Sequence, residues 1–365
     1  MLFKFEVVRM NGSADTSSGL LLREYKPRSK LRVPETRIHH PRLNVIDAHN
    51  HLGEDFGGDW CDRPVSELLD VLDEAHVQVL VDLDGGWGED ILQQHLDKFK
   101  AAAPERFCVF GGVDWSAWEE QGVRFGDWTA ERLRAQIAWG AQGLKIWKPF
   151  GLRVRDHKGE LVAVDDPRMD ILWATAGELG IPVLMHVADP VAFFDPLDNT
   201  NERWEELHVH TDWHFPNPPF PPFITIVEQL ANLVARHPET IFIGAHVGCY
   251  AENLKWVGEL LDCCPNFYVD IAARMGELGR QPYTARRFFI QYADRVLFGT
   301  DLTPDPEMYR LHYRFLESDD EYFNYDLDDP PPQGRWMIHG VYLPDDVLEK
   351  VYRKNAMKVL NIRAD

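Results

Sequence analysis

The sequence predicts an α/β fold, namely a (β/α)8 TIM barrel with long rim loops and an irregular N-terminal arm. Eight short apolar segments alternate with segments of helical pattern, and such continuous apolar runs are typical of parallel strands buried on both faces. No Gly-x-Gly-x-x-Gly motif follows the first strand, which argues against a dinucleotide-binding sheet. Polar residues also recur at the ends of the expected strands, where barrel enzymes place their active sites.

The alternation starts at residue 44, and we expect one barrel domain over residues 44–365. The preceding residues 1–43 are irregular, with a polar stretch at 13–18 and a basic one at 26–30. We interpret residues 1–43 as an arm that lies over the barrel or over a second subunit. A homodimer that exchanges this arm is therefore one expectation.

Each predicted strand is a short apolar run followed by a helical pattern. The expected strands are residues 44–51, 77–83, 107–113, 143–147, 182–187, 241–247, 267–271 and 295–301. The expected helices are residues 66–75, 89–103, 129–139, 166–179, 224–237, 251–263, 282–292 and 345–360. Asp166 is suited to cap its helix, with Pro167 at the first helical position. A hairpin is expected at 152–164, and two long excursions at 188–222 and 319–339, which at this length are usually functional.

Composition excludes several classes of function. The net charge of −21 argues against nucleic acid or an anionic membrane as partner, since both require a basic surface. No apolar run approaches the roughly 20 residues that a membrane helix needs. The five cysteines are odd in number and include the vicinal pair Cys263 and Cys264, which fits reduced thiols in a cytoplasmic protein.

The first strand ends in Asp47-Ala48-His49-Asn50-His51. Side chains two apart on a strand point the same way, so His49 and His51 share one face. Neutral imidazole is a common ligand for zinc and related divalent metals. Taken alone, the pair is more often an incidental polar strand end than a metal site.

Three further residues strengthen the metal interpretation. His186 lies near the end of the fifth strand, His246 near the end of the sixth, and Asp301 at the end of the eighth. In a barrel all these strand ends meet at one rim. Three imidazoles and a carboxylate suit Zn²⁺, with Mn²⁺ or Fe²⁺ as alternatives.

Four motifs taken together resemble the amidohydrolase superfamily, and most closely its amidohydrolase-2 group of aminocarboxymuconate-semialdehyde decarboxylase-like enzymes. The motifs are Asp47-Ala48-His49-Asn50-His51, Met185-His186, Gly244-Ala245-His246-Val247-Gly248 and Leu297-Phe298-Gly299-Thr300-Asp301. The resemblance runs from about residue 44 to the end. It implies that His49, His51, His186 and Asp301 hold one divalent metal, while His246 contacts the substrate.

The expected reaction is hydrolysis of a small ester, lactone or amide. A metal with an open position lowers the pKa of bound water to about 7, and Asp301 is placed to accept the proton of that water. His246 could polarise a carbonyl or protonate a leaving group. The motifs are equally compatible with a non-oxidative decarboxylase acting on a carboxylated substrate, and a ligand-binding barrel without turnover is a third reading.

Four residues are candidates for the substrate pocket. Arg274 follows the seventh strand and could hold a substrate carboxylate, or else pair with Glu277. Glu202 lies in the first long excursion, where it could equally anchor the loop. Trp147, at the end of the fourth strand, could wall an aromatic pocket or simply pack. The resemblance also implies a candidate role for Lys145 on the fourth strand, where some members of the superfamily have a carbamylated lysine that bridges two metals. An ion pair of Lys145 with a carboxylate such as Asp47 is favoured instead, and with it a single metal.

Overall fold

The computed structural model describes residues 26–53 and 58–362, and the chain divides into two units, residues 1–34 and 35–365. The predicted polar stretch 13–18 lies outside the described residues. The segment just before the first strand belongs to the second unit, because Thr36 Oγ1 donates to Asp320 Oδ1 at 2.7 Å and Arg42 N to Glu317 Oε1 at 3.1 Å. The arm–barrel boundary at 43/44 stays a prediction.

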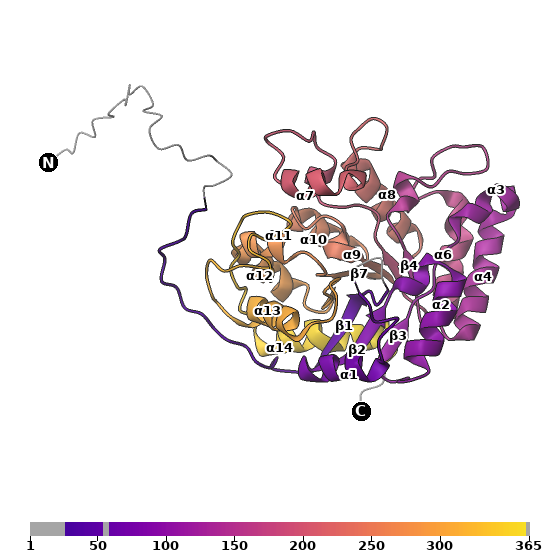
Figure 1. Ribbon diagram of the computed structural model, residues 1–365. Helices are drawn as coiled ribbons and strands as arrows, with labels where there is room; N and C mark the ends of the chain where they lie inside the picture. Colours follow the sequence, from indigo (N-terminus) through magenta and orange to yellow (C-terminus); the bar gives the residue numbers. More distant parts are fainter. Residues whose placement is uncertain (1–25, 54–57, 363–365) are drawn as a thin grey trace, which may run out of the picture. The chain divides into compact units, whose positions relative to one another are not determined.

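Eight short parallel strands follow one another in chain order among the described residues, with helices between them (Figure 1). Strands β1–β3 form one sheet and β4–β8 another, each pairing with its sequence neighbour. The strands are β1 Val45–Asn50, β2 Val77–Asp82, β3 Phe107–Val109, β4 Leu144–Ile146, β5 Val183–Met185, β6 Phe242–Gly244, β7 Phe267–Asp270 and β8 Val296–Leu297. The predicted α/β fold with eight strands is confirmed.

Backbone hydrogen bonds join the two sheets at both of their ends. Between β3 and β4, the amide of Lys145 donates to the carbonyl of Gly111 at 2.8 Å. Between β8 and β1, the amide of Ala48 donates to Phe298 O and the amide of Asp301 to His49 O, both at 2.9 Å. The first and last strands therefore lie side by side, as a barrel requires.

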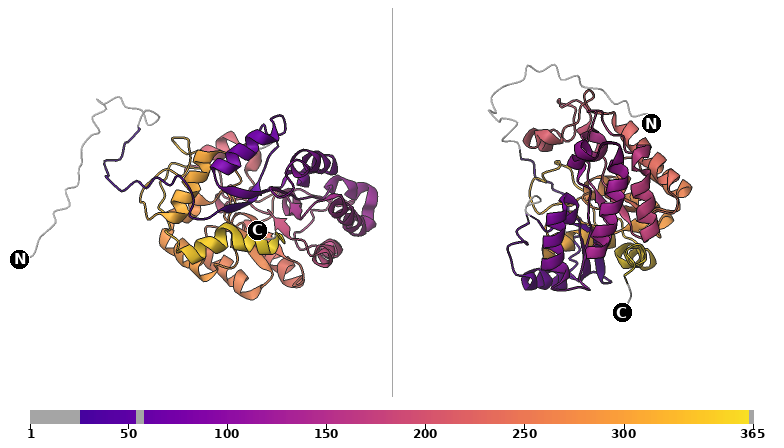
Figure 2. Two further views of the ribbon diagram at one scale, coloured as in Figure 1. Left: turned by 90° about the horizontal axis from the view of Figure 1, so that it is seen from below. Right: turned by 90° about the vertical axis from the view of Figure 1, so that its right-hand side faces the viewer.

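Alternate residues of each strand face two different cores. Val45 packs toward the helices, whereas its neighbour Ile46 packs in a cluster with Val81, Leu184 and Leu297 from other strands. This burial on both faces explains the continuous apolar runs in the sequence. The last helices, α14 Asp345–Glu349 and α15 Asn355–Val359, are joined by the π-helical turn Lys350–Lys354 and form the yellow end of the chain (Figure 2). The turn and α15 pack beside β1 and β8.

The principal outer helices match the predicted ones to within a few residues, apart from α13 and from the predicted helix 89–103, which is α2 followed by a π-helical turn that ends at Lys100. They are α1 Val65–Glu74, α2 Glu89–His95, α4 Phe125–Trp139, α6 Asp170–Leu179, α8 Phe223–Arg236, α10 Leu254–Cys263, α12 Pro282–Gln291 and α13 Pro306–Glu317. Asp166 caps as predicted, accepting from the amide of Arg168, but the first turn it caps is a 3₁₀ turn that precedes α6. No helix of the described residues is long and apolar enough to cross a membrane.

Helix α13 was missed in the sequence prediction, which left residues 302–318 without an element. The signal was present: Asp305 caps the helix by accepting from the amides of Glu307 and Met308, and Pro306 occupies the first helical position. The hairpin expected at 152–164 exists as a single antiparallel bridge between Arg155 and Leu161.

Short helices lie beside the rim, one of them in the first long excursion, whereas the described residues of the second excursion, 319–339, contain only the isolated bridge between Phe323 and Ile338. The first excursion contains α7 Trp204–Val209, and α11 Met275–Arg280 follows β7 and faces it. Shorter helices are α3 Trp118–Gln121, α5 Pro149–Leu152 and α9 Ala245–Gly248. Since these turns lie at the carboxyl ends of the strands, they frame the candidate site.

Candidate metal centre and active site

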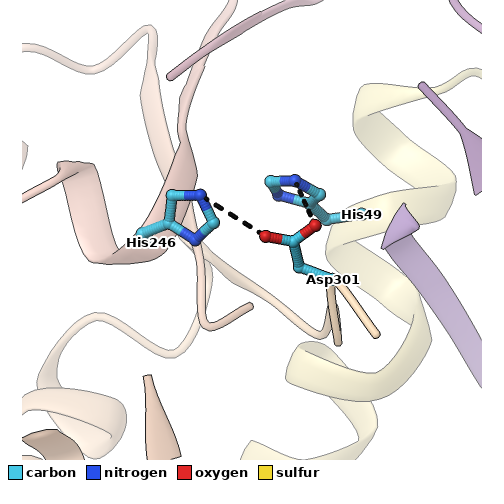
Figure 3. Close-up of side chains that lie close together, drawn as sticks. All are labelled: His49, His246 and Asp301. Atoms are coloured by element: carbon cyan, nitrogen blue, oxygen red, sulfur yellow. Dashed lines mark ion pairs between the residues drawn. The ribbon is translucent and has the colours of Figure 1, made fainter. Parts of the chain in front are cut away.

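The ends of strands β1, β6 and β8 bring His49, His246 and Asp301 together (Figure 3). One ligand atom from each of these residues lies within 4.8 Å of the other two. Asp301 lies between the two rings: its Oδ1 is 3.6 Å from His49 Nε2 and its Oδ2 is 3.7 Å from His246 Nε2. The predicted convergence of distant strand ends is therefore present in the structure.

The other two predicted histidines adjoin this group in different ways. His51 Nε2 lies 3.2 Å from Asp301 Oδ1, so His51 contacts the same carboxylate as His49. His186 packs edge-on against His246, with ring centroids 4.4 Å apart, and its Nε2 lies 3.2 Å from Asp189 Oδ1. The compact group thus includes His246, which the family resemblance assigned to the substrate. Which histidines bind a metal stays a prediction.

Three of the rings are oriented by acceptors behind them. The Nδ1–H of His49 donates to Asp270 Oδ2 at 2.9 Å, that of His51 to Asp84 Oδ1 at 2.7 Å, and that of His246 to the carbonyl of Ala272 at 2.9 Å. The Nε2 atoms of the neutral rings of His49 and His246 consequently face Asp301 with their lone pairs, while His51 Nε2 lies within hydrogen-bond distance of Asp301 Oδ1. Metal-binding histidines in proteins are held in this way, so the donor set fits a divalent ion.

The carboxylates of Asp270 and Asp84 accept hydrogen bonds from backbone amides as well as from the histidine rings. Asp270 Oδ1 accepts from the amide of His246 at 2.9 Å, while its other oxygen binds His49. Asp84 Oδ2 accepts from the amides of Leu52 and Gly53. Both were missed in the sequence analysis, although they stand at the carboxyl ends of β7 and β2, where the rule used for the histidines would have found them.

Burial sets the protonation of the group. Desolvation lowers the pKa of His49 and of His246 well below the usual range, which keeps both imidazoles neutral. For His51, burial lowers the pKa, but the hydrogen bonds to Asp301 and Asp84 outweigh it and raise the pKa to about 9. Burial raises the pKa of Asp301, but the surrounding imidazoles, His49 first, hold it well below its ordinary value.

Two of the site residues adopt left-handed backbone conformations. His246 has φ of 57° and Asp301 has φ of 56°, and each such residue costs roughly 1–3 kcal/mol when it is not glycine. Asp301 turns out of β8 at this point, which lets its amide reach His49 O. Strain of this kind persists only where the surrounding structure enforces it, and it clusters at functional sites.

Lys145 lies beside the metal group but does not pair with Asp47 as expected. Its Nζ is 3.5 Å from His49 Nε2, and burial lowers its pKa to about 8. Asp47 instead accepts hydrogen bonds from Thr300 Oγ1 at 2.7 Å and Tyr309 OH at 2.8 Å. The prediction that Lys145 pairs with Asp47 is therefore wrong, because the Asp47 carboxylate is bound by residues that follow β8 and that lie in α13.

Two cavities open at the rim, of about 450 and about 530 Å³. Arg274 lines the first, together with His246 and Asp301, and Trp147 lines the second. Glu202 lines neither: it pairs with Arg280, at 2.8 and 3.0 Å. Its neighbour Arg203 reaches the first cavity instead, which the sequence analysis did not anticipate.

Glu277 pairs with Arg203 and not with Arg274. Arg203 is 1% exposed and also donates to Glu206 Oε2 at 2.9 Å. Arg274 is 6% exposed and donates to its neighbouring carbonyl, Ala273 O, at 2.9 Å. Over residues 26–53 and 58–362, no carboxylate lies within ion-pair distance of Arg274. The cavity is thus lined by a buried guanidinium that has no ion-pair partner among the described residues.

Comparison with solved structures finds proteins of similar fold at low sequence identity. 2,6-Dihydroxybenzoate decarboxylase from Rhizobium aligns at 14% identity with a TM-score of 0.54, covering 88% of this chain and 99% of that one. A dihydroxybenzoic acid decarboxylase from Polaromonas sp. JS666, with bound manganese and 2-nitroresorcinol, aligns at 14% identity with a TM-score of 0.55, covering 88% and 98%.

A TIM-barrel protein of unknown function from Bordetella bronchiseptica aligns at 15% identity with a TM-score of 0.51, covering 88% of this chain and 99% of that one. These likenesses establish the fold. No curated protein matches the sequence. The family model described as amidohydrolase matches residues 46–362, which contain every histidine of the site and, apart from the first residue of β1, all eight strands. The chain therefore belongs to the amidohydrolase family, in the group that the amidohydrolase-2 model describes.

Proposed function

We propose that this protein is a metal-dependent enzyme that acts on a small carboxylated substrate, and that non-oxidative decarboxylation is its reaction. The observation that carries this proposal is Arg274, which is buried in the same cavity as His246 and Asp301 and has no carboxylate partner among the described residues. Burying a charge without a partner costs free energy. A substrate carboxylate would supply the missing partner through a bidentate contact with the guanidinium.

The other cations of the cavity are already neutralised. Arg203 pairs with Glu277 and Glu206, and Lys148 Nζ lies 2.6 Å from Asp189 Oδ2. An incoming carboxylate would have to compete with a protein carboxylate at these positions but not at Arg274. This difference directs the anionic end of the substrate to one place, close to Asp301.

His49, His51, His186 and Asp301 would hold the divalent ion, with His246 close enough to join them. When bound, the ion supplies positive charge that binds a substrate oxygen and stabilises negative charge developing on it. The donor set suits Zn²⁺ or Mn²⁺, and the structural relative from Polaromonas binds manganese.

The chain's own residues can then carry out the proton transfer. In decarboxylation the bond between the carboxyl carbon and the substrate carbon breaks, its electron pair stays on the substrate carbon, and that carbon takes up a proton. Asp301 lies between His51 and His246 and can hold this proton. Arg274 would orient the substrate by its oxygen atoms.

Hydrolysis is the second candidate, and the position of Asp301 favours it as well. A carboxylate among neutral imidazoles can accept a proton from an attacking water, as an ester, lactone or amide hydrolase requires. Structural relatives named as decarboxylases support the first candidate. Both reactions use the same residues, so they must be distinguished by their products: by whether CO₂ is released and by which solvent atoms the product takes up.

Isotopes distinguish the two reactions. Metal-loaded protein is incubated with dihydroxybenzoates, with lactones and with amides, in D₂O and separately in H₂¹⁸O. Decarboxylation releases CO₂ and leaves one deuterium on the product carbon, with no ¹⁸O from the solvent. Hydrolysis places ¹⁸O in the product and releases no CO₂. Failure of every carboxylated compound to react, alongside hydrolysis of a neutral ester, would reject the proposal.

A further inference from the structure

The second cavity at the rim differs in chemistry from the first. Its walls include Trp87, Trp147, Trp213 and Phe215, whereas Arg274 and Arg203 line the first cavity. Four residues line both cavities: Lys148, His186, Trp213 and Asp301. The carboxylate of Asp301 therefore lies between the two cavities, and a ligand bound beside it could extend into either of them.

The aromatic wall is fixed before any ligand arrives. Trp87 and Trp147 stack with ring centroids 4.0 Å apart at 20°. A Cβ on Gly86 would lie 2.7 Å from Trp147 Nε1, so the indole packs directly against the backbone of Gly86. On its other sides Trp147 has the His51 ring at 5.0 Å and Lys145 Nζ at 4.6 Å from the ring centroid. A platform held in this way loses little entropy on binding.

Charge determines which end of a ligand enters which cavity. Lys148, at the junction, is paired with Asp189, and Arg153 in the aromatic cavity is exposed and donates to the carbonyl of Asp212 at 2.7 Å. Arg274 is therefore the buried cation to which a carboxylate would go. Of the two stacked indoles Trp147 is buried, whereas Trp87 is 44% exposed and offers apolar area to which a planar group can bind by offset stacking.

We infer that the substrate has two parts: a carboxylated end beside Arg274 and Asp301, and a second planar, apolar group that occupies the Trp87–Trp147–Trp213 cavity. The carboxylate part rests on the proposed function, while the aromatic part rests on the second cavity alone. Each cavity has the volume of a pocket for a whole drug-sized ligand, which exceeds the need of a single small ring.

The test is calorimetric binding to the metal-loaded full-length protein, with three probes: benzoate, biphenyl-4-carboxylate and the uncharged 4-biphenylmethanol. We expect biphenyl-4-carboxylate to bind about tenfold tighter than benzoate, the gain expected of a favourable aromatic contact. Trp87→Ala should remove that advantage and leave the affinity for benzoate unchanged. Trp87→Phe should restore part of it.

Trp139→Ala is the matched control. Trp139 is 43% exposed and Trp87 is 44% exposed, but Trp139 ends α4 and lines neither cavity. The control should leave all three affinities unchanged. Equal binding of benzoate and biphenyl-4-carboxylate to the wild type, or an undiminished advantage in Trp87→Ala, overturns the inference.

Arg274→Ala separates this inference from the proposed function. It should weaken both carboxylates at least tenfold and leave 4-biphenylmethanol unaffected. If Arg274→Ala changes nothing while Trp87→Ala still weakens both biphenyls, the carboxylate part and the proposed decarboxylation fail, and the aromatic cavity stands. If 4-biphenylmethanol does not bind the wild type, the aromatic cavity fails whatever the carboxylates do.

Discussion

Asp84 Oδ1 accepts the Nδ1–H of His51 at 2.7 Å, from the turn that follows β2, while His51 directly follows the neighbouring strand β1. The same carboxylate holds the amides of Leu52 and Gly53, so it fixes both the ring and the chain that follows it. The orientation of a residue predicted to bind metal thus depends on a side chain 33 positions away.

Asp84→Asn should weaken metal binding about 10- to 100-fold, as changes to residues behind metal ligands commonly do. The measurement is competition for Zn²⁺ or Mn²⁺ against a chelator of known affinity. Asp70→Asn, an exposed change on α1, is the control and should have no effect. Unchanged metal affinity in Asp84→Asn would show that His51 does not contribute to the metal site.

Asp301→Asn should lower kcat/KM by a factor of 10² or more while the fold is retained. The side chain loses its ability to hold a proton, and asparagine tolerates the left-handed backbone at φ of 56°. The loss of activity is measured as turnover of a substrate found in the isotope experiment. Retention of the fold is checked by circular dichroism and by the melting temperature. Activity equal to that of the wild type would leave the carboxylate without a catalytic role.

Arg274→Lys should raise KM for a carboxylated substrate about tenfold or more, since lysine cannot make the bidentate contact. The change should act on KM more than on kcat if the guanidinium binds the substrate carboxylate throughout the reaction. Arg280→Lys is the control: Arg280 is the last residue of α11, the helix that begins directly after Arg274, and it pairs with Glu202 and lines neither cavity. Equal effects of the two changes would contradict the assignment.

His312→Leu should make the protein less sensitive to mild acid. His312 lies in α13, 1% exposed, and burial lowers its pKa to about 4. Since the unfolded chain binds this proton with a pKa of about 6.5, the folded state loses stability as the pH falls from 6.5 to 4. Over that window the loss is on the order of 3 kcal/mol.

Calorimetric melting temperatures at pH 7.5 and pH 4.5 test this expectation. The wild type should lose more melting temperature between the two values than His312→Leu does. His237→Leu serves as the comparison, since that ring is only partly buried and lies near Asp170 at 3.0 Å. Equal losses in the wild type and His312→Leu would show that His312 is not the group that titrates.

The sequence was sufficient to predict the strands and the rim. Strands such as 77–83 and 267–271 are apolar runs whose period and length are local properties of the chain. Once eight parallel strands are accepted, the barrel rule places His49, His246 and Asp301 at one end without further information. Two pairings considered from the sequence, Arg274 with Glu277 and Lys145 with Asp47, are not found in the structure.

Only the tertiary structure decided which charged groups meet. Glu277 lies three positions from Arg274 in the sequence, yet it pairs with Arg203, 74 positions earlier, since the first excursion folds back over α11. Likewise Asp47 turns to Thr300 and Tyr309 and leaves Lys145 beside His49. A hydrogen bond or ion pair needs atoms within about 3–4 Å, and that distance is set by the packing of whole elements, which no local pattern encodes.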